Sequence, residues 1–501
     1  MPTTSSPSSS PSSTFSRQLA RLLPQALSTV GMSGLVDAPR QGNKPDPRTP
    51  TRSTQERMDA YLRVEPEQLS PRNLRKLLAE LQAIVEPRIS EAEAIRQAQP
   101  FVDWYLQADA ESRADAWRLM TEQFAPDTAK VRQAKQQYDA ALGTAEEAQA
   151  EIRLRKAFHS PRTRLLQRIS ATRHGMRFLL DLRTELMPQL KREPALLPLD
   201  AELEHLFTGW FDIGFLQLQT INWDSPASLI EKLIKYEAVH DIVSWDDAKN
   251  RLDHDRRCFA FFHQRLPNEP LIFVEVALTR ELADNMVPLL DVSAGDVDLA
   301  RANTAIFYSI SNTQTGLRGV GFGDSLIKRV VEALQTELPQ IKRFATLSPI
   351  PGFRKWLEQE QNAESVAQAT TPKLRQPLVE ASGLSEADWM RQWPAKIDST
   401  LPRDANHPAQ QLLRGAAARY LSSLNERGQP LDPVARFHLG NGARLEHVHW
   451  LADPSAKGQR QSWGLMVNYL YDLGRLDRHR AMLAEGKAAL SREVMRLAQL
   501  G

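Results

Sequence analysis

The sequence predicts an α+β protein, with an all-α helical bundle first and a mixed α/β domain after it. Two observations support this division. Between residues 56 and 240, apolar residues recur three and four positions apart, which is the period of an amphipathic helix. After about residue 250, short runs of β-branched and aromatic residues alternate with turn residues, as strands do. At 501 residues, the chain is also too long for a single hydrophobic core.

The composition excludes several classes of protein. Lys and Arg number 63 against 61 Asp and Glu, so a net charge of +2 gives no support for a nucleic-acid or membrane-surface partner. A single cysteine, Cys258, excludes an internal disulfide and every multi-cysteine metal site. No apolar run approaches the roughly 18 residues that a membrane span needs. We therefore expect neither a nucleic-acid nor a membrane partner.

Residues 1–55 form a leader to which we assign no fold. It opens with "MPTTSSPSSSPSST", which is too rich in Ser and Pro to bury a core. The basic, amphipathic "FSRQLARLLPQAL" follows, and no acidic residue precedes Asp37, as in a transit peptide for the mitochondrial matrix. We favour a disordered leader on a cytoplasmic protein, because the Ser/Pro block lacks the interspersed arginines of import signals.

Residues 56–240 should form the helical bundle. Segments such as "SPRNLRKLLAELQAIVEPRI" and "TRLLQRISATRHGMRFLLDLRTEL" carry the helical period. Ser70 before Pro71 and Ser225 before Pro226 predict helix N-caps followed by a proline in the first turn. No cluster of residues in this range has the composition of a catalytic site, so the bundle is expected to serve as structural support or as a subunit contact.

Residues 241–501 should form the mixed domain. "RCFAFFH" and "LIFVEVALT" predict a hairpin, and strands are expected at 304–311 and 343–348. A helix separates the last two strands, so they should run parallel through a right-handed crossover. Helical periodicity returns at about 361–432 as an insertion, and "RHRAMLAEGKAALSREVMRLAQL" predicts one terminal helix that packs on the bundle or on another subunit.

A glycine-spaced turn, "GLRGVGFGDSLIKRVVEAL", connects the strand at 304–311 to the next helix. It lacks the Lys-Ser/Thr ending of a P-loop and the GxGxxG spacing of dinucleotide sites. Its Arg-x-x-Gly-x-Gly pattern resembles the coenzyme A pyrophosphate loop of the GNAT acetyltransferase fold, where backbone N–H groups and a helix N-terminus meet a diphosphate. The alternative is a turn that needs glycine only for positive φ. The expected CoA-binding residues are Arg318, Gly319, Val320, Gly321, Phe322, Gly323 and Asp324.

Five segments, in order, resemble the malonyl-CoA decarboxylase family: "RCFAFFHQRLPNEPLIFVEVALT", "AIFYSISNTQTGLRGVGFGDSLIKRVV", "LSPIPGFRKWL", "PVARFHLGNGARL" and "GLMVNYLYDL". The resemblance implies a helical N-terminal domain and a GNAT-like catalytic domain, assembled as a tetramer built from dimers. It implies a carboxy-lyase of fatty acid metabolism that converts malonyl-CoA to acetyl-CoA and CO2. No metal or organic cofactor is expected, because coenzyme A is part of the substrate.

The reaction needs donors for the thioester oxygen of an enolate and a proton for C2. By resemblance, Ser348 and His438 are the catalytic pair. His438 is expected to act as the acid, since its unperturbed pKa lies near working pH, with Ser348 as its hydrogen-bond partner. Without the resemblance, Ser348 would be taken for a turn residue before a proline and His438 for a satisfied core side chain.

Two further catalytic candidates, Tyr471 and Ser309, are supported by fewer observations. Tyr471 carries a donor that could meet the substrate carboxylate or the thioester oxygen, although a packed core aromatic is the equal alternative. Ser309 could bond the malonyl group, and strand alternation places it on one face with Ser311, opposite Ile310.

Two other functions remain open from the sequence. A GNAT-type N-acyltransferase would use the same CoA loop but would need an acceptor channel and a base for an amine. A non-catalytic acyl-CoA-binding regulator would keep the loop and have no use for Ser348 and His438.

Overall fold

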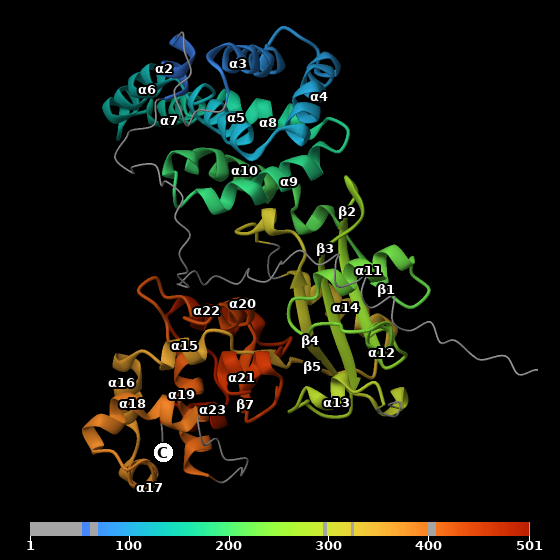
Figure 1. Cartoon of the computed structure of the whole chain (residues 1–501), viewed down its shortest axis with the longest axis vertical. Helices are drawn as coiled ribbons and strands as arrows, with labels where there is room; N and C mark the ends of the chain where they lie inside the picture. Colours follow the sequence, from blue (N-terminus) through green and yellow to red (C-terminus); the bar gives the residue numbers. More distant parts are fainter. Residues whose placement is uncertain (1–52, 61–68, 294–297, 322–324, 399–406, 500–501) are drawn as a thin grey trace, which may run out of the picture.

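The computed structural model describes residues 53–60, 69–293, 298–321, 325–398 and 407–499. Figure 1 shows a helical domain at one end of the molecule, a sheet beside it, and a group of C-terminal helices along the other side of the sheet. This arrangement confirms the predicted α+β class, with a helical N-terminal domain followed by a GNAT-like mixed domain. The predicted leader, residues 1–55, lies almost entirely outside the described residues.

The helical domain contains α2 (Thr54–Asp59), α3 (Pro71–Val85), α4 (Glu91–Gln107), α5 (Ala110–Glu122), α6 (Thr128–Ala141), α7 (Glu147–Ala157), α8 (Pro161–Ser170), α9 (Gly175–Leu186) and α10 (Leu197–Trp210). The predicted cap of α3 is confirmed, because the Ser70 side chain accepts the N–H of Asn73 and Pro71 occupies the first turn. The cap predicted at Ser225 is wrong. Pro226 itself precedes the next helix, and the Ser225 hydroxyl bonds Asn222 instead.

The sheet has the order β1-β2-β3-β4-β5-β8-β6, and β7 pairs with β8 outside this path. Its strands are β1 (Leu216–Ile221), β2 (Arg256–His263), β3 (Leu266–Thr279), β4 (Thr304–Asn312), β5 (Arg343–Thr346), β6 (Ser348–Pro349), β7 (Arg444–His449) and β8 (Met466–Leu470). The hairpin of β2 and β3 is confirmed, as is the parallel pairing of β4 with β5 across α14 (Ser325–Glu337). β1 lies within the range assigned to the bundle, so the sheet begins earlier in the chain than predicted.

β4 and β5 separate after a short parallel stretch. They pair only from Thr304 to Phe307 on β4, and the N–H of Leu347 makes a last bond to the Phe307 carbonyl at 3.1 Å. Beyond it, the chain passes into β6, which pairs with β8 instead of β4. A β-bulge at Tyr308 changes the register of β4 against β3 at the same level. The strand predicted at 343–348 is therefore two short strands, β5 paired with β4 and β6 turned away from it.

The two faces of the sheet pack against different elements. Alternate residues on β3, such as Phe273 and Glu275, face the helices α11 (Ala227–Tyr236) and α12 (Trp245–Asn250). In the chain, these two helices connect β1 to β2, and they cover this face of the sheet. The opposite face, with Val274 and Phe307, joins the large core shared by α14 and the helical domain. Cys258 is buried on the α11 face, within β2 as predicted, and burial raises the pKa of its thiol.

The remaining helices are α13 (Val287–Leu290), α15 (Phe353–Leu357), α16 (Glu360–Ala369), α17 (Pro372–Ser382), α18 (Glu386–Asp398), α19 (Pro408–Ser422), α20 (Pro433–Gly440), α21 (Ala456–Ser462), α22 (Leu476–Ala484) and α23 (Arg492–Ala498). The helical insertion at 361–432 is confirmed. The single terminal helix is wrong, because α22 and α23 are separated where Gly486 adopts φ +79°. α23 packs on α19 and β7, within the C-terminal domain.

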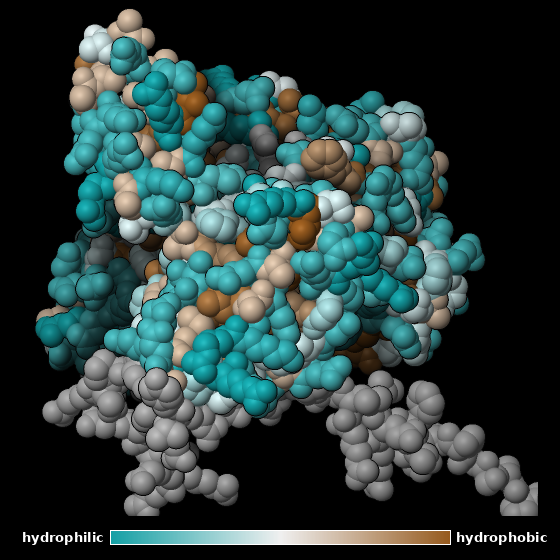
Figure 2. Space-filling model, turned by 90° about the horizontal axis from the view of Figure 1, so that it is seen from above, coloured by the Kyte–Doolittle hydropathy of each residue, from teal (hydrophilic) through white to brown (hydrophobic). Residues whose placement is uncertain are grey.

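The surface seen in Figure 2 is mostly hydrophilic, with smaller hydrophobic areas between the polar side chains. In the part of the chain that the structure describes, no helix is long and apolar enough to cross a membrane.

Candidate functional site

Ser348 lies where the chain leaves β5 for β6, one residue after the last bond to β4. Pro349 favours an extended conformation for the residue before it, so Ser348 pairs with Val467 of β8. The side chain is 6% exposed, and its Oγ donates to Thr346 Oγ1 at 2.8 Å. Thr346 Oγ1 also accepts the Tyr469 N–H at 3.2 Å. The serine hydroxyl is therefore fixed in a buried site beside the gap between β4 and β6.

His438 is brought to Ser348 by the short helix α20. The Asp432 side chain caps this helix by accepting the N–H groups of Val434 and Ala435 at 2.9 and 2.8 Å. His438 lies in the last turn, 3% exposed, with Nε2 3.3 Å from Ser348 Oγ. Its ring stacks on Tyr469 with a centroid distance of 4.6 Å. Two residues 90 positions apart in sequence thus meet in one buried site.

Tyr471 completes a chain of hydrogen bonds through the imidazole. Its hydroxyl is 2.7 Å from His438 Nδ1, and a hydrogen bond from Asn441 acts on the same phenol oxygen. When the phenol donates to Nδ1, the proton of the neutral imidazole sits on Nε2 and points to Ser348 Oγ. Ser348 then donates to Thr346, so the donor direction is consistent along the whole chain. Tyr471 therefore orients the imidazole.

Burial sets the charge state of this group. It lowers the pKa of His438 to about 3 and raises the pKa of the Tyr471 phenol well above its usual value. The pKa of His438 thus lies well below the unperturbed value on which its expected role as the acid is based. The imidazole is neutral at neutral pH because no described anionic side chain compensates the loss of water around it.

Ser309 is not part of this group. The bulge at Tyr308 places it opposite Glu275, on the face of the sheet covered by α11 and α12, together with Ser311 as predicted. Its Oγ donates to both carboxylate oxygens of Glu237, at 2.9 and 2.8 Å. Thr346 and Ser348 lie on the other face, beside Phe307 and Tyr471.

The cluster around Ser309 contains buried charges that the sequence analysis missed. Arg251 lies between Asp247, at 2.9 Å, and Glu275, at 3.1 Å, and all three side chains are almost fully buried. Burial, together with the charge of Glu237, raises the pKa of Glu275 to about 8. Burial also raises the pKa of Glu237. The signal was present in "LIFVEVALT", because a carboxylate at an inward position of an apolar strand requires a buried partner.

The glycine-rich turn is described only as far as Gly321, so the predicted residues Phe322, Gly323 and Asp324 lie outside the described residues. Gly319 has φ +86°, a conformation that favours glycine, so part of the motif has a backbone reason. A Cβ on Gly321 would meet nothing within 4 Å. Among the described glycines of the motif, Gly321 is therefore the one whose free side faces open space.

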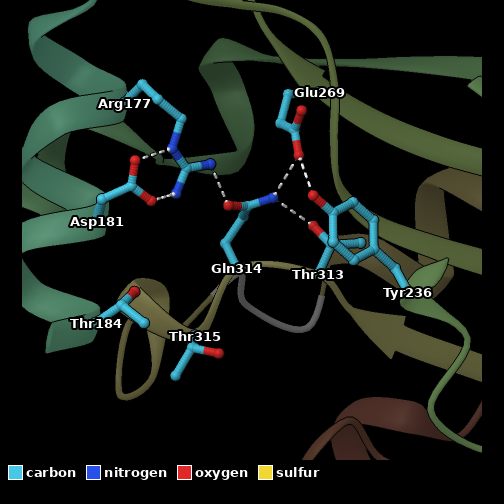
Figure 3. A pocket seen from close by; sticks show the side chains of 8 residues that line it. All are labelled: Arg177, Asp181, Thr184, Tyr236, Glu269, Thr313, Gln314 and Thr315. Carbon is cyan, nitrogen blue, oxygen red and sulfur yellow. Dashed lines mark hydrogen bonds and ion pairs between the residues drawn. The ribbon is translucent and has the colours of Figure 1, made fainter. Parts of the chain in front are cut away.

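A cleft of about 360 Å³ lies beside the start of this turn, between α9 and the end of β4. Figure 3 shows Gln314 at its centre, bonded on one side to Arg177 and on the other to Glu269. Arg177 is also held by Asp181, and Glu269 by Tyr236. The cleft does not include Ser348 or His438. With two carboxylates and one guanidinium in its lining, it does not attract a polyanion such as a diphosphate.

Metal ligation has no candidate in the described ranges, where no three His, Cys, Asp or Glu side chains are grouped to hold an ion. The buried group itself consists of hydroxyls and one imidazole.

Two family models match most of the chain. One, described as the malonyl-CoA decarboxylase C-terminal domain, matches residues 214–500, and the corresponding N-terminal domain matches residues 124–211. A protein of Mus musculus named "Malonyl-CoA decarboxylase, mitochondrial" is 37% identical over 411 residues, covering 76% of this chain and 81% of the relative. The relative of the same name from Anser anser anser is 35% identical over 415 residues, covering 76% and 78%.

Solved structures agree with these matches. The malonyl-CoA decarboxylase of Rhodopseudomonas palustris is 39% identical, with a TM-score of 0.72, and the alignment covers 84% of this chain and 99% of that one. The enzyme of the same name from Cupriavidus metallidurans is 42% identical, with a TM-score of 0.67, covering 85% and 100%.

The lowered pKa of His438 predicts a pH dependence of stability. Below its unfolded pKa of about 6.5, the unfolded chain binds a proton that the folded chain excludes, so acidification should reduce the free energy of unfolding by up to about 1.4 kcal/mol per pH unit until about pH 3. The variant His438→Gln has no titrating imidazole at this position and therefore lacks this contribution to the pH dependence. Relative to this variant, the wild type should lose about 2 kcal/mol more between about pH 7 and pH 5 in urea titrations. Parallel pH dependences would show that the imidazole protonates freely in the folded state.

Proposed function

The chain belongs to the malonyl-CoA decarboxylase family, and from that premise we propose that it is a carboxy-lyase that converts malonyl-CoA to acetyl-CoA and CO2. The observation that supports this function most strongly is the buried chain of Tyr471, His438 and Ser348 beside the gap between β4 and β6. In the GNAT fold, the pantetheine arm of coenzyme A binds in this gap, so that the thioester lies near the centre of the sheet.

The proposed chemistry uses the neutral, desolvated site. When CO2 leaves, the electron pair of the broken C–C bond moves into the thioester as an enolate, and C2 must then gain a proton. The malonyl carboxylate brings an anion next to His438 and raises its pKa, because an opposite charge favours the imidazolium. We propose that the Ser348 and His438 pair delivers this proton to C2, and that solvent returns it after acetyl-CoA leaves.

The other expected residues have proposed roles that follow their positions. Tyr471 bonds Nδ1 of His438 and therefore orients the ring. Ser309 lies on the opposite face of the sheet with its hydroxyl engaged by Glu237, so we propose that it does not bond the malonyl group. The turn from Arg318 to Asp324 is proposed to bind the CoA diphosphate. We propose that no metal or organic cofactor takes part.

Assembly and location are also proposals. The exposed large hydrophobic side chains of the helical domain, such as Leu106 and Phe158, support a homo-oligomer, for which we propose a tetramer of two dimers. We propose a cytoplasmic location and a role in fatty acid metabolism. The mitochondrial matrix is the alternative, and it is supported by the names of the relatives from Mus musculus and Anser anser anser.

One assay tests the function against its two alternatives. The protein is incubated with malonyl-CoA and no acceptor amine, while CO2 and acetyl-CoA are measured. A decarboxylase produces both in equal amounts, because one C–C bond is broken per turnover. An N-acyltransferase stalls without an amine, and an acyl-CoA-binding regulator leaves malonyl-CoA intact.

The pair of Ser348 and His438 predicts a double-mutant result. His438→Ala should lower kcat by at least ~100-fold, the lower end of general acid–base assistance. Ser348→Ala should also be slow, and the double variant should be about as slow as the slower single variant, since the two residues share one proton path. Steady-state kinetics on folded proteins measures this. If the two losses multiply, the residues act independently and the pair must be abandoned.

The open space at Gly321 predicts an effect on binding alone. Gly321→Val should fold normally, because its Cβ meets nothing, and should raise KM for malonyl-CoA by roughly 10- to 100-fold, as one or two charge-assisted bonds to phosphate are lost. Gly209→Val is the matched control, since Gly209 on α10 also has nothing within 4 Å of an added Cβ. An unchanged KM in folded Gly321→Val would count against this loop as the CoA site.

A further inference from the structure

The loop proposed to bind coenzyme A rests on the helical domain through one buried arginine. Arg183 of α9 is 1% exposed and reaches under the turn. One of its nitrogens, Nη1, donates to the carbonyl oxygens of Gly316 and Arg318, at 2.9 and 2.8 Å. Its other nitrogens bond Asp200 at 2.8 Å and Glu204 at 2.6 Å, both on α10. A single guanidinium therefore joins two helices of the bundle to the backbone of the turn.

The backbone of the turn lies directly on these helices. A Cβ on Gly316 would stand 2.3 Å from the Leu180 carbonyl oxygen, and one on Gly319 would stand 2.8 Å from the Glu204 carboxylate. Figure 3 shows Thr184 of α9 beside Thr315 at the start of the same segment. Glycine at 316 is thus required by close packing on the backbone of α9, whereas glycine at 319 is favoured by its φ of +86°.

The contacts of Arg183 fix which way the peptide groups of the turn face. In a planar trans peptide, the carbonyl and the following N–H point in opposite directions. Because the Arg318 carbonyl points at Arg183, the N–H of Gly319 points away from the helical domain. No acceptor among the described residues takes this N–H. Outward N–H groups in a turn form a concavity that binds anions.

Arg183 also balances the charges beneath the turn. Asp200 and Glu204 lie next to it, and Glu204 is the closest side chain to Gly319. Without the guanidinium, two carboxylates would face the loop and repel a diphosphate. The arginine therefore holds the carbonyls inward and neutralises the anions that would otherwise weaken binding.

We infer that Arg183 is a positioning residue for coenzyme A binding, and that the helical domain takes part in substrate recognition by holding the phosphate loop through it. This inference rests on the proposed function, because it assumes that the turn meets the CoA diphosphate. Arg183 does not touch the substrate in this arrangement. It acts through the orientation of the peptide groups between Gly316 and Gly319.

The test compares two thioesters with the same reacting end. Malonyl-CoA carries the diphosphate, whereas malonyl-pantetheine lacks it. In Arg183→Met, KM for malonyl-CoA should rise roughly 10- to 100-fold, as expected for losing one or two charge-assisted bonds, with kcat nearly unchanged. For malonyl-pantetheine, kcat/KM should match the wild type. Arg183→Lys, which keeps the charge but has a single ammonium group, should show a smaller rise and decides the matter if Arg183→Met does not fold.

Arg168→Met is the matched control. Arg168 on α8 is also buried and bonds the carbonyls of Ile84 and Glu86 and the carboxylate of Glu91, but it makes no contact with the turn. This variant should lose thermal stability and leave both thioesters unaffected. If Arg183→Met behaves like Arg168→Met, or if it slows both thioesters in parallel, Arg183 is only structural and the inference is wrong.

The same experiment separates the inference from the proposed function. A wild type that releases no CO2 from either thioester refutes the decarboxylase, and calorimetric titration with CoA then decides the role of Arg183 by itself. Weaker CoA binding by Arg183→Met than by the wild type supports the inference, and equal binding refutes it. A wild type that uses both thioesters equally well refutes the loop as the diphosphate site, and the role of Arg183 with it.

Discussion

The separation of β4 from β5 is the constraint on which the site depends. The parallel pair ends with the bond from the Leu347 N–H to the Phe307 carbonyl, and the next residue, Ser348, already belongs to a strand that pairs with β8. Pro349 contributes to this change, because a residue before proline is held extended and proline has no N–H to offer a partner strand. The result is a gap in the middle of the sheet, where the end of β4 has no partner on this edge among the described strands and a serine lies at the border.

Desolvation then determines what the side chains at the gap can do. On one face, His438 is buried against Tyr469 without a described anionic partner, and burial lowers its pKa, so the imidazole is neutral at neutral pH. On the other face, Glu237 and Glu275 lie near the single guanidinium of Arg251, and their pKa values are raised. In the proposed reaction, the anionic malonyl group would therefore lie beside a neutral imidazole from which water is excluded.

The helical domain contributes to the site without supplying a reacting group. Its helices α9 and α10 form the surface on which the glycine-rich turn lies, and the close approach at Gly316 leaves no room for a side chain. Arg183 makes this contact specific, because its planar donors fit two carbonyls and two carboxylates at once. The bundle was expected to provide only support or subunit contacts. Its role includes setting the backbone of a loop that belongs to the other domain.

The sequence by itself determined the elements and the family. Helical periodicity, the hairpin of β2 and β3, and the parallel crossover through α14 follow from local patterns, since each depends on residues close in sequence. The motifs around Ser348 and His438 gave the candidate pair by resemblance. Local pattern failed where a single residue changes the backbone, as at Gly486, where one predicted helix became two.

Only the tertiary structure decided how these parts act together. Whether Ser309 faces His438 or Glu237 depends on a bulge at Tyr308 that no pattern in β4 signals. The neutral state of His438 depends on its burial beside Ser348, which lies 90 positions earlier in the sequence. In the same way, Arg183 meets Gly316 across 133 positions. The charge state of a side chain and the direction of its hydrogen bonds depend on the groups that surround it in the folded protein. A sequence names the groups, but their energies are set by which other groups, and how little water, folding places beside them.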